Sequence, residues 1–326
     1  MTAVSARRRT ATHKPALALF AGLGSAWVFV LVVLGAFTTS IGAGMAFPDW
    51  PLSNGSLNPI GWLSDRNMFS EHAHRLSAGI MTIVTLILAI WIWRRDVRSW
   101  LRKLAVFAFV LIFVQAIVGG LRVLFDPVKI ASGETSVGRL FAMLHACLAQ
   151  LFVCTLIAVA LACSRGWIER RTPVSPSLGR TGVVCCLLLF CQLAIAAVMR
   201  HSFAGLAIPT FPYSTADGGL LPVDWNFRVG IHFAHRTMAV VLTVALVWFA
   251  IKIWADRGTS LLMRCGASLL VGLLAFQLLL GAWIIWSRHA VTMTTGHVLV
   301  GAATLATAFS LTWLAHRDRI ERPLTP

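Results

Sequence analysis

Residues 43–51 read AGMAFPDWP, and residues 204–212 read AGLAIPTFP. The two segments lie 161 residues apart, and at the same spacing the Ala-His-Arg triplet at 73–75 aligns with the Ala-His-Arg triplet at 234–236. Chance supplies Gly and Ala matches between apolar segments, but it does not readily align two Pro pairs and this triplet without a gap. The pattern therefore predicts an internal duplication of the chain.

The duplication continues further along each half. Gln-x-x-x-Gly at 115–119 aligns with Gln-x-x-x-Gly at 277–281, at a spacing of 162 residues. His145 has a counterpart in His297, which comes ten residues early because the second half has a shorter outer loop before it. The repeat thus includes polar residues that an apolar segment has no packing reason to contain.

Long apolar runs surround the repeated motifs. Of the 326 residues, 58% are hydrophobic and only 12% are charged, whereas soluble domains carry about 25% charged residues. Each run is long enough to cross the roughly 30 Å hydrocarbon core of a bilayer as a helix. The expected spans are 17–39, 73–94, 101–124, 139–163, 179–199, 232–253, 262–286 and 292–315. This composition excludes a soluble enzyme, a disordered chain and a disulfide scaffold, and it predicts an all-α polytopic membrane protein with eight transmembrane helices in two duplicated four-helix bundles.

The domain boundary follows from the repeat. We expect an N-terminal half, residues 1–170, and a C-terminal half, residues 171–326, joined in the basic, Pro- and Ser-containing stretch 164–178. Because each half has an even number of spans, the two halves run in the same direction about an axis along the membrane normal. The first apolar run, of about 22 residues, is longer than the 7–15 residues of a cleaved signal, so we expect it to stay in the mature protein.

Basic residues gather on one side of the expected spans. That side holds 19 of the 28 Lys and Arg residues: Arg7, Arg8, Arg9, Lys14, Arg94, Arg95, Arg98, Arg102, Lys103, Arg165, Arg170, Arg171, Arg180, Lys252, Arg257, Arg264, Arg317, Arg319 and Arg322. By the positive-inside rule, both termini are expected to be cytoplasmic, in a protein of the cell membrane. The net charge of +16 is then a topology signal, whose partner is anionic lipid headgroups rather than nucleic acid.

All seven cysteines fall within or at the ends of apolar spans: Cys147, Cys154, Cys163, Cys185, Cys186, Cys191 and Cys265. None lies in an outer loop, where a disulfide would be permitted, and no Cys-x-x-Cys pair occurs. We interpret them as small buried core residues.

Four of the ten histidines respect the duplication: His74 and His145 in the first half, and His235 and His297 in the second. Each lies within about two turns of the outer end of its expected span, so each half presents two imidazoles from different helices at similar depth. A heme with two axial histidines needs this arrangement. The alternatives are hydrogen-bonded core histidines and a metal-transport site. The latter would want carboxylates or thiolates beside the imidazoles, which the second half lacks.

The two halves differ at one informative place. Glu71-x-x-His74 in the first half becomes His232-x-x-His235 in the second. Glu71 shares a helix face with His74 and with Arg75, where a carboxylate can accept a proton, hydrogen-bond an axial ligand or position a water. The alternative is an interfacial Glu71–Arg75 ion pair. Since burying ionisable groups in a membrane is expensive, the asymmetry predicts that the first half performs chemistry and the second carries electrons.

Arg75 and Arg236 lie on the outer side in both halves, against the charge rule. Heme propionates are anionic, so each guanidinium is a candidate propionate partner; the alternative is an arginine that snorkels to the interface. Trp50 and Phe211, in the Pro-rich segments, are candidates to cover a ring edge. Three further histidines break the symmetry and are interpreted as solvated: His72, His201 and His289.

These motifs together resemble the heme A synthase family. The resemblance spans residues 17–315 and rests on Phe47-Pro48-Asp49-Trp50-Pro51, Glu71-His72-Ala73-His74-Arg75, His145, His232-Phe233-Ala234-His235-Arg236 and Gly296-His297. It implies an eight-span enzyme that oxidises the methyl group at ring position 8 of heme O to the formyl group of heme A.

The resemblance also implies roles for particular residues. His235 and His297 would ligate a heme b cofactor, His74 and His145 would flank the substrate heme O, and Glu71 would be the acid/base group. Heme O synthase and a membrane electron acceptor are the expected partners.

The sequence departs from many family members in one respect. They carry a cysteine pair in the first outer loop, where this chain has Ser53 and no outer-loop cysteine. The sequence therefore resembles the subgroup that lacks the pair, and a thiol-mediated step is not implied.

Two other functions are compatible with paired histidines in a membrane bundle. One is a cytochrome b-like quinol oxidoreductase, which predicts tightly bound heme in both halves and a quinone pocket. The other is a heme carrier without turnover. A permanent heme b with a variable second heme, O or A, in the purified protein would favour the synthase.

Overall fold

The computed structural model describes residues 11–126 and 136–321. This part of the chain is helical, without a β-strand, and eight of its helices are long and apolar enough to cross a membrane. These are α1 (Pro15–Ser40), α2 (Arg66–Arg95), α3 (Ser99–Phe125), α4 (Val137–Cys163), α6 (Pro176–His201), α7 (Phe227–Ala255), α8 (Leu261–Trp286) and α9 (Val291–Ala315). Two short helices, α5 (Arg165–Glu169) and α10 (Arg317–Ile320), follow α4 and α9. The all-α membrane fold expected from composition is confirmed.

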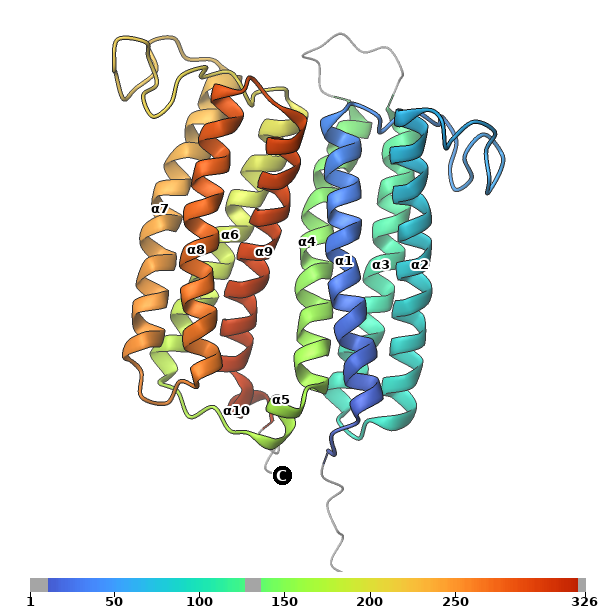
Figure 1. The fold of residues 1–326 in the computed structure, drawn as a ribbon, viewed down its shortest axis with the longest axis vertical. Helices are drawn as coiled ribbons and strands as arrows, with labels where there is room; N and C mark the ends of the chain where they lie inside the picture. Colours follow the sequence, from blue (N-terminus) through green and yellow to red (C-terminus); the bar gives the residue numbers. More distant parts are fainter. Residues whose placement is uncertain (1–10, 127–135, 322–326) are drawn as a thin grey trace, which may run out of the picture.

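The long helices form two bundles that lie side by side (Figure 1). In the first bundle α1 packs on α2 and α4, and α3 packs on α2 and α4. The second bundle repeats this ring of contacts with α6, α7, α8 and α9 in the same order. The bundles meet where α1 packs on α9 and where α4 packs on α6 and α9.

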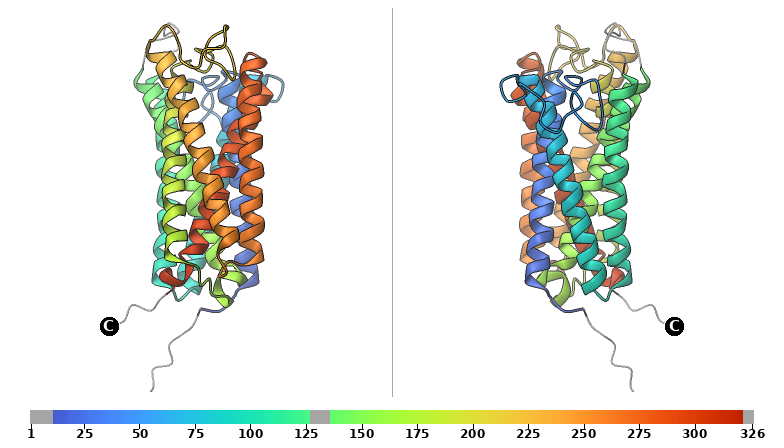
Figure 2. Two further views of the ribbon diagram at one scale, coloured as in Figure 1. Left: turned by 90° about the vertical axis from the view of Figure 1, so that its left-hand side faces the viewer. Right: turned by 90° about the vertical axis from the view of Figure 1, so that its right-hand side faces the viewer.

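The connections separate the molecule into two unlike ends (Figures 1 and 2). One end, which we call the loop end, carries the long connections 41–65 and 202–226 and the short connection 287–290. The opposite end, which we call the basic end, carries residues 11–14, 96–98, 164–175, 256–260 and 316–321. The basic residues predicted to share one side lie at or beside the basic end, except Arg7, Arg8, Arg9 and Arg322, which fall outside the described residues.

Two helices begin earlier than the apolar pattern predicts. α2 begins at Arg66 rather than near residue 73, because the Asp65 carboxylate accepts hydrogen bonds from the backbone N–H groups of Asn67 at 2.9 Å and Met68 at 2.8 Å. α7 begins at Phe227 rather than near residue 232, after a similar Asn226 cap. The apolar run marks the membrane core, whereas the cap decides where the helix starts.

The cysteine interpretation is right for four residues and wrong for two. All seven are free, and Cys154, Cys163, Cys185 and Cys186 are buried. Cys147 is half-buried, and Cys191 and Cys265 are exposed. Because a thiol is small and weakly polar, it is tolerated on the outward side of a membrane helix as well as in the core.

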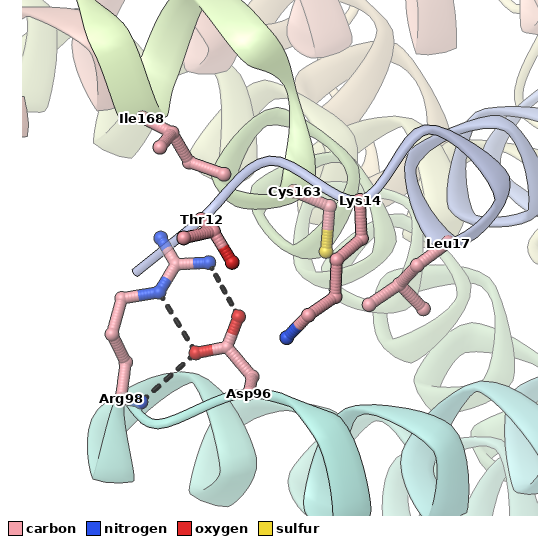
Figure 3. A pocket seen from close by; sticks show the side chains of 7 residues that line it. All are labelled: Thr12, Lys14, Leu17, Asp96, Arg98, Cys163 and Ile168. Carbon is pink, nitrogen blue, oxygen red and sulfur yellow. Dashed lines mark hydrogen bonds and ion pairs between the residues drawn. The ribbon is translucent and has the colours of Figure 1, made fainter. Parts of the chain in front are cut away.

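An ion-pair cluster ties the two halves together at the basic end. Figure 3 shows the part of it that lies in the first half, the pair of Arg98 and Asp96. The Arg98 guanidinium donates through Nε and NH2 to the two oxygens of Asp96, at 2.9 and 2.8 Å. It also pairs with Glu321 at 3.0 Å, and the Trp167 indole donates to the same Glu321 oxygen at 2.6 Å. Glu321 follows α10 of the second half, so this cluster holds the segment after that helix against the first half.

Candidate functional site

His235 on α7 and His297 on α9 face each other within the second bundle. Their ring centroids are 6.4 Å apart, with 55° between the ring planes. The Nδ1 atoms of both rings are buried and have no hydrogen-bond partner in residues 11–126 and 136–321. Since metal–imidazole nitrogen bonds are about 2 Å long, this spacing leaves room for one iron between the rings. The pair therefore fits the axial ligation of a heme.

The first bundle places His74 on α2 and His145 on α4. His145 hydrogen-bonds through Nδ1 to the Gln115 carbonyl oxygen at 3.0 Å, and the Gln115 amide donates back to the His145 carbonyl oxygen at 2.7 Å. Such a bond fixes the orientation of a ring and leaves its other nitrogen for a metal. The Nδ1 atom of His74 is buried and has no partner among the described residues.

Glycines let the histidine rings approach the neighbouring helices. A Cβ atom at Gly35 would lie 2.9 Å from His74, and one at Gly119 would lie 2.8 Å from His145, both closer than side chains pack. Gly281 lies against His297 in the same way, at 3.3 Å. The repeated Gln-x-x-x-Gly motif thus has a structural reason in both halves: its glycine makes room for the imidazole of the next helix.

Glu71 and His232 occupy equivalent positions in the two halves. Glu71 is only 4% exposed, and it accepts from the Phe47 backbone N–H at 3.1 Å and from Arg75 at 2.6 Å. In the second half, Nδ1 of His232 lies 3.2 Å from the Ile208 backbone nitrogen and Nε2 lies 3.2 Å from Nε of Arg236. A neutral imidazole accepts a hydrogen bond at only one of its two nitrogens, so His232 matches the position of Glu71 but not its capacity to accept both bonds. The Glu71–Arg75 ion pair considered as an alternative is therefore formed, but it is buried rather than interfacial.

Both duplicated arginines hold the connections of the loop end. Arg75 donates to the carbonyl oxygens of Asp49 at 2.7 Å and Leu52 at 2.6 Å. Arg236 donates to the carbonyl oxygens of Ile208 at 3.0 Å and Thr210 at 2.6 Å. These donors are directed to backbone, so contact with a heme propionate stays a prediction for both residues.

The connection 41–65 is ordered by its own polar groups. Although burial opposes ionisation of Asp49, hydrogen bonds from the backbone N–H groups of Gly55 and Asn54 hold the pKa of Asp49 below its ordinary value. Trp50 lies against the backbone of Gly120 on α3. Its repeat counterpart Phe211 instead packs edge-on against Trp286, with ring centroids 6.1 Å apart.

The interpretation of His72 as solvated is wrong. His72 is 3% exposed, and its two ring nitrogens hydrogen-bond the Ser53 hydroxyl at 3.0 Å and the Leu57 carbonyl oxygen at 3.1 Å. The connection 41–65 folds over this part of α2, which a helix pattern alone does not reveal. His289 is exposed as expected, and His201 is half-buried.

Several polar groups near the histidines were missed in the sequence. The Gln192 amide lies 3.4 Å from Nε2 of His235 and donates to the His235 carbonyl oxygen at 3.1 Å. Arg122 on α3 carries a buried Nε atom without a hydrogen-bond partner in the described chain. Neither residue has a repeat counterpart of its own type, since Leu31 and Ile284 stand at the equivalent positions. An isolated polar residue in a span was the available signal for both.

His235 and His297 are in ring contact, and His74 and His145 lie near enough to interact electrostatically. Among the described residues, no group of three or more His, Cys, Asp or Glu side chains is arranged to hold a bare metal ion. Nitrogen ligands in pairs suit an iron whose other ligands come from a porphyrin.

Comparison with known proteins gives the family. The model of the COX15-CtaA family, described as cytochrome oxidase assembly protein, matches residues 63–309. A heme A synthase of Shouchella clausii is 28% identical over 275 residues, which cover 82% of this chain and 86% of that protein. A heme A synthase of Geobacillus kaustophilus is 26% identical over 305 residues, which cover 90% of this chain and 89% of that protein. The resemblance seen in the motifs is confirmed, and the chain belongs to the COX15-CtaA family of cytochrome oxidase assembly proteins.

Proposed function

We propose that this chain is a heme A synthase, an enzyme that oxidises the C8 methyl group of heme O to the formyl group of heme A. The observation that carries the proposal is the pair of histidines repeated in both bundles, on α2 and α4 and on α7 and α9. Similarity to proteins named heme A synthase over most of the chain supports the same reaction.

The second half is the site for the resident heme b. His235 and His297 would be its axial ligands, and Gln192 orients the His235 helix turn through its hydrogen bond to the backbone. The bound heme supplies one-electron transfer. In this half His232 stands where the first half has Glu71, so the repeat supplies no carboxylate at that position.

The first half is the site for the substrate heme O. His74 and His145 would flank the porphyrin, with the His145 ring held by Gln115. Conversion of a methyl group to a formyl group removes four electrons and releases protons, so a proton acceptor is needed near the reacting carbon. Among the described residues, Glu71 is the carboxylate buried at the loop end of this half, whereas the buried Asp96 lies at the basic end, so Glu71 is the acid/base candidate.

Glu71 reaches the loop end through defined contacts. One of its oxygens is held by Arg75 and the other by the Phe47 backbone N–H. These two contacts fix the position of the carboxylate, which suits a group that accepts protons during oxidation. Together with the other hydrogen bonds of Arg75, these contacts hold the connection 41–65 against α2.

The proposal extends to the surroundings of the enzyme. The protein lies in the cell membrane with the basic end and both termini in the cytoplasm, as its charge distribution indicates. Heme O synthase supplies the substrate, and a membrane electron acceptor takes the electrons.

The duplication offers a matched pair of variants to test this division. The protein is purified from cells that co-express heme O synthase, and its pigments are extracted and identified. His235→Ala should remove the low-spin heme b spectrum, whereas His74→Ala should keep heme b and accumulate heme O with little heme A. His297→Ala and His145→Ala should repeat the two results.

Three outcomes contradict the proposal. Equal loss of heme b in both variants of the matched pair would favour two permanent hemes, as in a quinol oxidoreductase. Retention of heme b in His235→Ala and His297→Ala would remove the second-half assignment. Bound heme without any heme A from the unmodified protein would indicate a carrier.

A further inference from the structure

Arg122 lies in the last turn of α3 at the loop end, and its guanidinium is packed into the protein rather than directed to solvent. The guanidinium rests on the backbone of Gly44, where a Cβ atom would lie 2.8 Å from its central carbon. The Nε atom is buried and has no hydrogen-bond partner in residues 11–126 and 136–321. A buried cationic donor without a partner is costly, so the site is built for an anion.

The carboxylates that attract the Arg122 guanidinium already hydrogen-bond other protein groups. Glu71 and Asp126 both attract Arg122 electrostatically. The two oxygens of Glu71 accept hydrogen bonds from Arg75 and from the Phe47 backbone, and Asp126 accepts from the Ser136 hydroxyl at 2.9 Å. Arg200, another arginine at this end, donates to the Ala36 carbonyl oxygen at 3.1 Å and to the Ser40 hydroxyl at 2.8 Å. Arg75 and Arg200 are thus occupied by protein groups, and Arg122 retains a free buried donor.

Arg122 is also placed beside the histidine pair of the first half. Its positive charge acts on both His74 and His145, and it acts on His201 at the junction with the second half. No arginine stands at the equivalent position of the second half, where the residue is Ile284. Arg122 is therefore a feature of the proposed substrate site in the first half and is not part of the internal repeat.

We propose that Arg122 binds a propionate carboxylate of the substrate porphyrin and so orients the ring between His74 and His145. This inference rests on the proposed function, because it takes the first half as the porphyrin site. Arg–carboxylate pairs are directional and charge-assisted, so one such contact selects among the rotations of a flat ring about its iron axis. The proposal gives Arg122 the role of propionate partner, for which the sequence suggested Arg75.

The test uses the purified protein with its resident heme b, in a neutral detergent free of anionic lipid. Ferric protoporphyrin IX and its dimethyl ester, which has no carboxylate, are titrated in and followed by optical difference spectra. Arg122→Gln should weaken binding of the acid porphyrin by about 10- to 100-fold and leave the ester unchanged. Arg122→Lys should restore part of the preference for the acid.

The matched control is Arg66→Gln, which alters an exposed arginine at the same end of the same half. It should bind both porphyrins as the unmodified protein does, and an unchanged heme b spectrum should report the fold of each variant. Equal weakening of acid and ester in Arg122→Gln, or no weakening, would overturn the inference and return Arg122 to a structural or lipid-headgroup role. A preference for the acid that depends on Arg122 in a protein that forms no heme A would uphold the anion site and overturn only the proposed reaction.

Discussion

Glu71 and His232 each hold the preceding connection against their helix, but one is a carboxylate and the other an imidazole. Each lies one helical turn before an arginine and accepts a backbone N–H from the preceding connection, of Phe47 or of Ile208. The loop end is therefore fastened alike in both halves, whereas only the first half gains a negative charge. Because an imidazole is sufficient to hold the connection in the second half, holding the connection does not by itself explain why the first half has a carboxylate.

Glu71→Gln should leave heme b in place and reduce heme A formation by about 100-fold or more, the range of a lost acid/base group. Gln keeps the size and can still accept the Phe47 hydrogen bond, but it cannot take a proton. Because the Glu71–Arg75 pair is buried, some destabilisation is also expected, about 3–5 kcal/mol in comparable pairs. The quantity to measure is therefore the ratio of heme A to heme b in folded protein, which corrects for any loss of folded protein.

The control for this change is His232→Gln, at the duplicated position. It should lower heme A per heme b by less than Glu71→Gln does, since no proton transfer is assigned to His232. A normal heme A ratio in Glu71→Gln would show that the ion pair is structural and that the catalytic carboxylate lies elsewhere.

Helix α3 brings three features of the first site onto one face. Gln115, Gly119 and Arg122 follow at spacings of four and three residues, which place them on the same side of a helix. Gln115 holds the backbone and ring of His145, Gly119 makes room for that ring, and Arg122 extends toward Gly44. The element therefore supports the substrate site without contributing a histidine.

Gly119→Ala should lower heme O conversion per folded protein by about tenfold or more. The added methyl group would meet the His145 ring at 2.8 Å and displace it by several tenths of an ångström, and site geometry tolerates only about 0.5 Å. Conversion is measured from extracted pigments, and heme b content reports the second half.

Gly79→Ala on α2 is the control, because nothing lies within 4 Å of a Cβ atom there. Alanine is the better helix former by about 1 kcal/mol, so this variant should be as stable as the unmodified protein or more so. Unimpaired conversion in Gly119→Ala would contradict the requirement for a fixed His145 ring.

At the scale of the whole molecule, the two bundles are joined through α1 and α4 of the first half and α6 and α9 of the second. The basic end adds the Arg98–Glu321 pair and the Trp167 contact, which fasten Glu321 to the first half. All four site histidines lie toward the other end, beside the connections that Arg75 and Arg236 hold. The halves are also fastened at that end, where Arg200 of α6 donates to the Ala36 carbonyl oxygen and the Ser40 hydroxyl of α1.

The orientation of the molecule predicts which residues an impermeant thiol reagent reaches in intact cells. Ile60→Cys and Ala216→Cys, both exposed at the loop end, should be labelled from outside. Arg257→Cys, exposed at the basic end, should be labelled only after lysis. Labelling of the unmodified protein measures the background from the exposed native thiols Cys191 and Cys265. Ser53 is unsuitable because it is 1% exposed and hydrogen-bonded to His72. The opposite pattern of labelling would reverse the topology.

Hydropathy and the internal repeat were sufficient to predict the eight spans, the two bundles and the four paired histidines. Burial of a bilayer-spanning helix depends on composition over about 20 residues, and a duplicated motif keeps its spacing whatever packs around it. Family-level motifs such as Glu71-x-x-His74 were visible for the same reason, since they are local along one helix.

Other features depend on which distant segments meet, and only the tertiary structure decides them. The connection 41–65 buries His72 and uses up the donors of Arg75, and it also lies against Arg122 through Gly44. Cys191 and Cys265 face outward although their apolar surroundings in the sequence match those of the buried cysteines. A hydropathy pattern does not distinguish a lipid-facing side from a protein-facing side, and it does not reveal which donor finds a partner across the bundle. The packing of α6 and α8 on their neighbouring helices decides the first, and the contacts of the connection 41–65 with α2 and α3 decide the second.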